Sequence, residues 1–258
     1  MSTRGALVTG AGALLLLTAC SSGVREVAPA PSSSTPTSTA PSSSAPTSSS
    51  PTPSISGTEV VFEDDFRSSS SGWETGSLPS GTTFAYGKNA YVVVARGGGN
   101  HTQYAPHQAI TRPGATATFV LARSAPAGTA VGVTCRGGSD SAGTEIQFLV
   151  EPSTGAWRIE TYSGAAISTD STQVVAKGRT KGTAATRPIA VTGRCLTQTG
   201  GKVTRAVLLV DGRVVADRRV ATDPADAAEW RTGLTVSDVD RGATTVLVTA
   251  YEVRFYPE

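Results

Sequence analysis

Short hydrophobic runs separated by Gly, Pro, Asp and Ser fill the chain after Gly57. Near the end, Tyr251, Val253 and Phe255 alternate with polar residues, which is the pattern of a strand with one face buried and one face in water. The only helix that we expect is about one turn at Pro224–Trp230. Further strands are expected over Ala90–Ala95, Thr116–Leu121, Ala130–Thr134, Glu145–Glu151, Ala156–Tyr162, Val203–Val210 and Arg213–Arg219.

Two turn signals join pairs of these strands into hairpins. Asp211-Gly212 is a dipeptide that accepts positive φ in a two-residue turn. Pro152–Gly155 forms a second turn of typical composition. Many short antiparallel strands without an internal repeat predict an all-β fold, a two-sheet antiparallel β-sandwich or jelly roll.

The first nineteen residues, 1–19, have the pattern of a bacterial signal peptide. Arg4 supplies the positive charge, and Ala11–Leu17 forms a short apolar run. This run is too short for a stable membrane-spanning helix, which needs about 20 residues. We therefore expect export from the cytoplasm.

Leu17-Thr18-Ala19-Cys20 resembles a lipobox, in which small residues precede a cysteine that receives a diacylglyceryl group. The alternative is an ordinary secretory signal in which the cysteine occurs by chance. The position of Cys20 at the end of the apolar run favours a lipoprotein, with lipidation of Cys20 and two or three acyl chains, such as palmitate, as the membrane anchor. The expected location is the outer face of the cytoplasmic membrane.

Residues 20–57 follow as a tether, and 24 of the 30 residues of Val27–Ser56 within it are Ser, Thr or Pro. Such a segment has too little apolar surface to offset the entropy of ordering it, so we expect it to be disordered. Its hydroxyls are possible O-glycosylation sites. The remaining residues, 58–258, are enough for one β-sandwich domain.

Charge and motifs exclude several function classes. The formal net charge is +2 with scattered basic residues, so nucleic acid is not an expected partner. The two histidines, His101 and His107, are not part of an HExxH motif, and no GxSxG motif is present. We interpret residues 100–107 as a polar loop.

Two cysteines remain after lipidation of Cys20. Cys135 and Cys195 each lie at the end of an expected strand, and outside the cytoplasm an isolated pair forms a disulfide most simply. Closing a loop of about 60 residues stabilises a domain by about 4 kcal/mol in the chain-entropy model.

Six segments have a familiar order and composition: Phe62–Phe66, Ser71–Trp73, Gly132–Arg136, Phe148–Ile159, Val191–Cys195 and Leu209–Ala216. Together they resemble the extracytoplasmic concanavalin A-like (lectin/glucanase, laminin-G-like) domains of actinobacteria. The resemblance covers most of Val60–Tyr256 and implies a concanavalin A-like jelly roll. Its motifs concern structure, so they imply little about activity.

Domains of this kind commonly hold sugars through aromatic and polar side chains, so the resemblance implies a carbohydrate-binding module for the cell envelope. Tyr104 and Trp230 occur in polar, loop-like surroundings and are expected to be exposed. Tyr86 and Tyr162 are further candidate ligand residues. Trp73 and Trp157, by contrast, are expected in the core.

A glycoside hydrolase is a less favoured alternative. Glucanases of this fold carry a strand with Glu-x-Asp-x-(x)-Glu, and the most similar segment here has Gln147 in place of the Asp. Glu145 and Glu151 would lie about 20 Å apart along an extended strand, which does not suit a mechanism with two carboxylates. We therefore expect no catalytic residue and no enzyme.

A third alternative is a protein-partner or sensory domain at the cell envelope, which nothing in the sequence distinguishes from sugar binding. No cofactor is expected. Calcium is a minor possibility if Asp64 approaches Asp238 and Asp240, since carboxylates suit this ion and terminal strands of this fold often pair.

Overall fold

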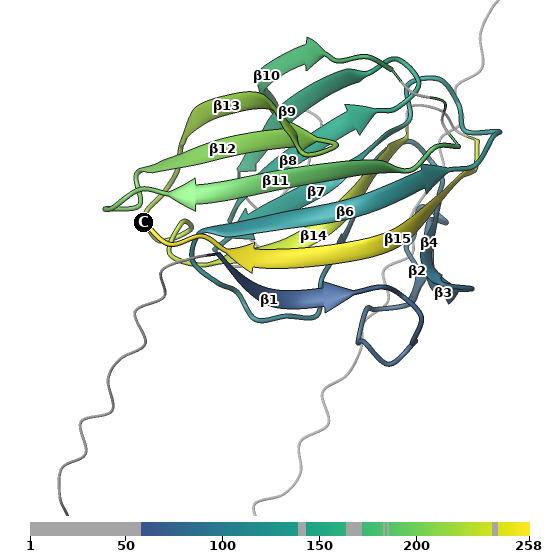
Figure 1. Cartoon of the computed structure of the whole chain (residues 1–258), viewed down its shortest axis with the longest axis horizontal. Helices are drawn as coiled ribbons and strands as arrows, with labels where there is room; N and C mark the ends of the chain where they lie inside the picture. Colours follow the sequence, from purple (N-terminus) through teal and green to yellow (C-terminus); the bar gives the residue numbers. More distant parts are fainter. Residues whose placement is uncertain (1–57, 139–142, 164–171, 183, 185, 239–241) are drawn as a thin grey trace, which may run out of the picture. The chain divides into compact units, whose positions relative to one another are not determined.

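The computed structural model describes residues 58–138, 143–163, 172–182, 184, 186–238 and 242–258 (Figure 1). The expected signal peptide, lipidated Cys20 and tether lie outside these residues, as does Asp240. Within the described part of the chain, no helix has the length and apolar character needed to cross a membrane.

Fifteen described strands form two antiparallel sheets that lie one over the other (Figure 1). The nine-stranded sheet has the order β13 (Arg213–Ala221), β12 (Val203–Val210), β11 (Ile189–Thr197), β6 (Pro113–Leu121), β15 (Thr244–Phe255), β4 (Ala90–Ala95), β3 (Thr83–Gly87) and β2 (Gly76–Ser77), and β1 (Glu59–Asp64) also pairs with β15. The six-stranded sheet has the order β10 (Gln173–Arg179), β9 (Ala156–Ser163), β8 (Thr144–Glu151), β7 (Ala130–Gly137), β14 (Trp230–Asp238) and β5 (Gly99–Tyr104). The predicted all-β sandwich is confirmed.

A disulfide joins the two sheets through the core. Cys135 on β7 is bonded to Cys195 on β11, with 6.5 Å between their Cα atoms, so the predicted pairing is confirmed. Gly193, two residues before Cys195, lies against the ring of Phe148 on β8. A Cβ at position 193 would be 2.3 Å from that ring, so glycine permits the close approach of the sheets here.

The predicted hairpin at Asp211-Gly212 is confirmed. Asp211 and Gly212 have φ values of 47° and 75°, and Val210 pairs with Arg213 across the turn. Trp73 and Trp157 belong to the buried core, as expected.

Two expectations about local structure are wrong. Pro224–Trp230 holds no helix; Ala227 N donates to Asp223 O at 2.9 Å in a single turn, and Trp230 already begins β14. The polar loop expected at residues 100–107 is strand β5 up to Tyr104. Its alternation of apolar and polar residues is missing because the inward-facing residue His101 is itself polar and contacts Thr82 Oγ1.

Candidate binding face

The outer face of the six-stranded sheet is polar. Successive side chains of a strand point to opposite faces, so the residues between those of the core lie on the outside. We call this surface the polar face. It consists of Asn100, Thr102, Tyr104, Thr134, Arg136, Glu145, Gln147, Arg158, Glu160, Tyr162, Arg231, Thr235 and Ser237.

Glu145 is the centre of this face and is 1% exposed. Its carboxylate accepts hydrogen bonds from Tyr104 Oη at 3.0 Å, Thr134 Oγ1 at 2.9 Å and Gln147 Nε2 at 2.7 Å. Arg136 Nη1 forms a salt bridge with it at 3.2 Å. Burial of a carboxylate is tolerated when its charge is paired and its oxygens are hydrogen-bonded, and these donors meet both conditions.

A second set of hydrogen bonds extends this network around Glu145 to β9. Asn100 Nδ2 donates to Gln147 Oε1 at 2.8 Å and also to the hydroxyl of Tyr162. The Tyr162 hydroxyl donates to Glu160 Oε2 at 3.1 Å, and Arg158 Nε pairs with Glu160 Oε1 at 2.7 Å. The hydrogen bonds therefore run without interruption from β5, at one edge of the sheet, to β9.

The ionisation of the two tyrosines is suppressed. Burial, with the adjacent Glu145 carboxylate, raises the pKa of Tyr104. Burial and the Glu160 carboxylate raise the pKa of Tyr162 to about 12. Burial lowers the pKa of Arg136, but Tyr104 and Glu145 more than offset this, so the pKa of Arg136 is raised overall. At neutral pH both phenols are hydrogen-bond donors and Arg136 is a cation.

Part of the polar face is accessible to a ligand. Asn100, Thr102, Tyr104, Arg158 and Arg231 are each partly exposed. The guanidinium of Arg231 lies over the ring of Tyr104, 4.9 Å from its centroid. The partly exposed side chains thus offer amide, hydroxyl, aromatic and guanidinium groups. The buried side chains around Glu145 hold them in place.

Two of the four candidate ligand residues lie on the polar face. Tyr104 and Tyr162 come together on the polar face through Glu145, Gln147 and Asn100. Tyr86 lies instead on β3 in the other sheet.

The hydroxyl of Tyr86 contacts Ser71 Oγ at 3.0 Å and accepts a hydrogen bond from Trp73 N at 2.9 Å. Trp230 is 0% exposed, so the expectation of an exposed aromatic is wrong there. Its indole points into the core and donates to Thr197 Oγ1 at 2.9 Å, although its neighbours in sequence are polar.

Sequence patterns alone did not single out several residues of this face, namely Asn100, Arg136, Arg158, Glu160 and Arg231. Glu160 lies opposite Gln147 in the β8–β9 pairing, so it shares the outer face with Glu145. The turn at Pro152–Gly155 fixes this register, and the alternation along both strands was the available signal. Glu151 is at the far end of β8, where it accepts a hydrogen bond from Gly128 N at 2.9 Å.

The calcium candidates do not share a strand pair. β1 pairs with β15 as expected, and Asp64 at its end accepts a hydrogen bond from Phe66 N at 2.7 Å. Asp238 ends β14 in the other sheet, opposite Gly99. Among the residues that the structure describes, no three or more His, Cys, Asp or Glu side chains are grouped to hold a metal ion.

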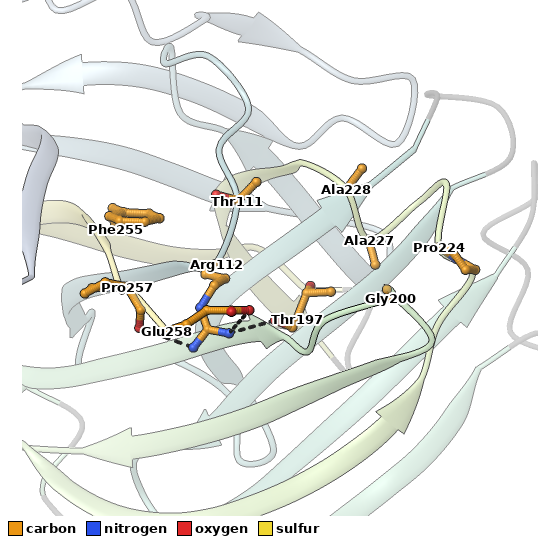
Figure 2. Close-up of a pocket in the computed structure, with 11 residues that line it drawn as sticks. Thr111, Arg112, Thr197, Gly200, Pro224, Ala227, Ala228, Phe255, Pro257 and Glu258 are labelled. Atoms are coloured by element: carbon orange, nitrogen blue, oxygen red, sulfur yellow. Dashed lines mark hydrogen bonds and ion pairs between the residues drawn. The ribbon is translucent and has the colours of Figure 1, made fainter. Parts of the chain in front are cut away.

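A separate cavity of about 690 Å³ lies near the C-terminus (Figure 2). Arg112 is its main polar group: Nη1 donates to Thr197 O at 2.8 Å, Nε donates to Tyr256 O at 2.9 Å, and Nη1 lies 3.5 Å from Glu258 Oε1. Because these donors are engaged within the protein, the cavity offers mainly the apolar walls formed by Pro224, Ala227, Ala228, Phe255 and Pro257.

No protein-family model matches the sequence, and no curated protein matches it. Solved structures share the fold at low identity. A glycoside hydrolase family 16 endo-glucanase from Bacteroides ovatus is similar over 74% of this chain and 99% of its own, with 9% identity and a TM-score of 0.52. The carbohydrate recognition domain of Emp46p, in a potassium-bound form, is similar over 70% of this chain and 87% of its own, with 10% identity and a TM-score of 0.50. The chain therefore has the sandwich fold of these domains.

Proposed function

We propose that the domain is a carbohydrate-binding module for a polysaccharide of the cell envelope and that the polar face is its binding site. The observation that carries the proposal is the partly exposed group of Asn100, Tyr104, Arg158 and Arg231, held by the buried network around Glu145. The presence of a carbohydrate recognition domain among proteins with this fold supports the proposal.

The chemistry of the face suits a sugar. A saccharide presents hydroxyls that donate and accept hydrogen bonds, together with an apolar ring surface. Asn100 and Arg158 supply polar groups for the hydroxyls, and Tyr104 supplies an aromatic ring. Because Glu145 and Glu160 fix these side chains before binding, less conformational entropy is lost when a ligand orders them.

We further propose that the domain is not an enzyme. A retaining glycosidase needs two carboxyl groups about 5–5.5 Å apart, of which one acts as a proton donor. Here Gln147 stands where the Glu-x-Asp-x-(x)-Glu motif has its Asp. Each carboxylate of the face forms a salt bridge with an arginine, Glu145 with Arg136 and Glu160 with Arg158. These pairings favour a binding role over acid–base chemistry.

The proposed location is the outer face of the cytoplasmic membrane, with the lipid on Cys20 as the anchor. Replacing Cys20→Ala should move the protein from the membrane fraction to the medium or soluble fraction. The variant Ser21→Ala is the matched control and should remain with the membrane. Retention of the Cys20→Ala protein on membranes would refute lipid anchoring.

Binding is tested with the purified full chain on a glycan array that includes cell-wall polysaccharides, with and without calcium. Specific binding of a polysaccharide is the expected result. A blank array with a folded protein would reject carbohydrate binding and favour a protein partner, which a pull-down from envelope extract would then identify.

A further inference from the structure

Five exposed cations lie along one edge of the sandwich. We call them the basic edge; they are Lys177, Arg179, Lys181, Arg187 and Arg213. Their side chains make no hydrogen bond or ion pair within the described residues. This contrasts with the arginines of the polar face, such as Arg136 and Arg158, which are paired with carboxylates.

Three of these cations surround a groove of about 590 Å³. Lys181, Arg187 and Arg213 line it, and among the described residues that line it Asp211 is the one with a carboxylate. That carboxylate accepts a hydrogen bond from the backbone N of Ala190 at 2.9 Å. The groove therefore has an excess of positive charge.

Backbone contacts anchor one end of this groove. Thr180 N donates to Gly155 O at 2.8 Å, which fixes the start of the segment after β10 to the β8–β9 turn. A Cβ on Gly182 would lie 2.7 Å from Ser153 O, so the backbones are in close contact there. The opposite wall is the Asp211-Gly212 hairpin, with Val210 and Val215 beside it.

Protection against unwanted strand pairing explains only part of the basic edge. β10 and β13 end their sheets, and charged residues on such strands prevent association with other chains. This accounts for Lys177, Arg179 and Arg213. It does not account for Lys181 and Arg187, which lie between β10 and β11 and line the groove.

We propose that this groove binds the carboxylate or phosphate groups of an acidic polysaccharide. Like charges gathered in a groove raise the local concentration of anions, and an anion bound there relieves their mutual repulsion. Lys177 lies opposite Arg158 in the β9–β10 pairing, so the basic edge adjoins the polar face. The identity of the polymer rests on the proposed function, whereas anion binding by the groove does not.

The test measures binding of the full chain, kept in a non-ionic detergent, to polygalacturonate and to uncharged dextran. We expect the protein to bind polygalacturonate and not dextran, and the binding to weaken as salt is added. The triple variant Lys181→Gln, Arg187→Gln, Arg213→Gln should bind about tenfold more weakly. The matched control removes three exposed cations elsewhere, Lys88→Gln, Arg123→Gln and Lys202→Gln, and should bind as the unchanged protein does.

Other outcomes overturn the proposal. Equal weakening by both triple variants would show a general charge effect, and lack of polygalacturonate binding would rule out the site. Binding to phosphatidylglycerol vesicles that is lost in the groove variant, without polygalacturonate binding, would assign the groove to membranes. Failure of the proposed function is distinguishable: a blank glycan array, together with polygalacturonate binding that is lost in the groove variant, would reject the polar face as a sugar site and leave the groove in place.

Discussion

Tyr104 on β5 donates a hydrogen bond of 3.0 Å to Glu145 on β8, although β14 and β7 lie between these strands. Three strand spacings amount to about 14 Å, so both side chains must lean across the sheet. Gly233 on β14 is the partner of both Tyr104 and Thr134, and it has no side chain to block the path. The absence of a side chain at this position therefore lets one carboxylate of β8 bond residues of both β5 and β7.

Loss of the Glu145 carboxylate should destabilise the domain strongly. In Glu145→Ala, the buried Arg136 loses the carboxylate that forms its salt bridge. Removing one partner of a buried pair costs about 3–5 kcal/mol, because the other charge stays buried. The free energy of unfolding, measured with urea, tests this value.

The control is Asp65→Ala, because Asp65 pairs with Arg67 at the surface with side chains 63% and 78% exposed. No measurable change is expected there, since solvent screens such pairs. A loss in Glu145→Ala no larger than that in the control would contradict the structural role of the network.

The contact between the sheets at Gly193 predicts a local packing effect. In Gly193→Ala, the new methyl group meets the ring of Phe148, and such overpacking costs about 1–3 kcal/mol. Gly242→Ala is the matched control, because no other described residue beyond its chain neighbours lies within 4 Å of a Cβ there. Thermal unfolding should separate the two variants; equal melting temperatures would show that the sheets are not in close contact at position 193.

The disulfide should contribute to stability through the unfolded chain. Cys135 and Cys195 are 60 residues apart, and a crosslink over such a loop contributes about 4 kcal/mol in the chain-entropy model. Unfolding with and without a reductant should therefore give clearly different midpoints. The double variant Cys135→Ser, Cys195→Ser should be insensitive to the reductant, and an unchanged midpoint in the native protein would reject this contribution.

The lowered pKa values of the two histidines predict that the folded domain loses stability in weak acid. Burial lowers the pKa of both His101 and His107 from the ordinary value of 6.5. The unfolded chain binds protons near that pH while the folded chain does not, so stability falls as the pH drops through 6.5 toward the lowered values. Urea unfolding should show this fall, and the double variant His101→Gln, His107→Gln should reduce it. An equal fall in the variant would assign the effect to other groups.

Sequence patterns identified those elements whose buried residues are apolar. The strand with Tyr251 and Val253, the Asp211-Gly212 hairpin and the pairing of Cys135 with Cys195 follow from alternation, turn chemistry and the oxidising compartment. β5 was missed because it carries polar residues on both faces.

The site was predicted only in part for a related reason. Tyr104 and Tyr162 lie on one face, but Glu160 is placed beside Tyr162 and on the same face as Glu145 by the pairing of β8 with β9, and spacing along one strand does not reveal this. Trp230 illustrates the opposite error, because polar neighbours in sequence concealed an indole that points into the core. In both cases the strand register determines the position of the side chain.

The most direct test of the proposed binding site compares Tyr104 with Tyr256. Each tyrosine has an arginine over its ring, and the two arginines belong to different sheets. Tyr104 has Arg231 over its ring at 4.9 Å, and Tyr256 has Arg194 over its ring at 4.6 Å. We would measure the affinity of the full chain for the polysaccharide bound on the array by isothermal titration calorimetry. Tyr104→Ala should weaken binding about tenfold, equivalent to about 1.4 kcal/mol, and Tyr256→Ala should leave it unchanged. Unchanged binding by Tyr104→Ala, or equal losses in both variants, would contradict the assignment of the site to the polar face.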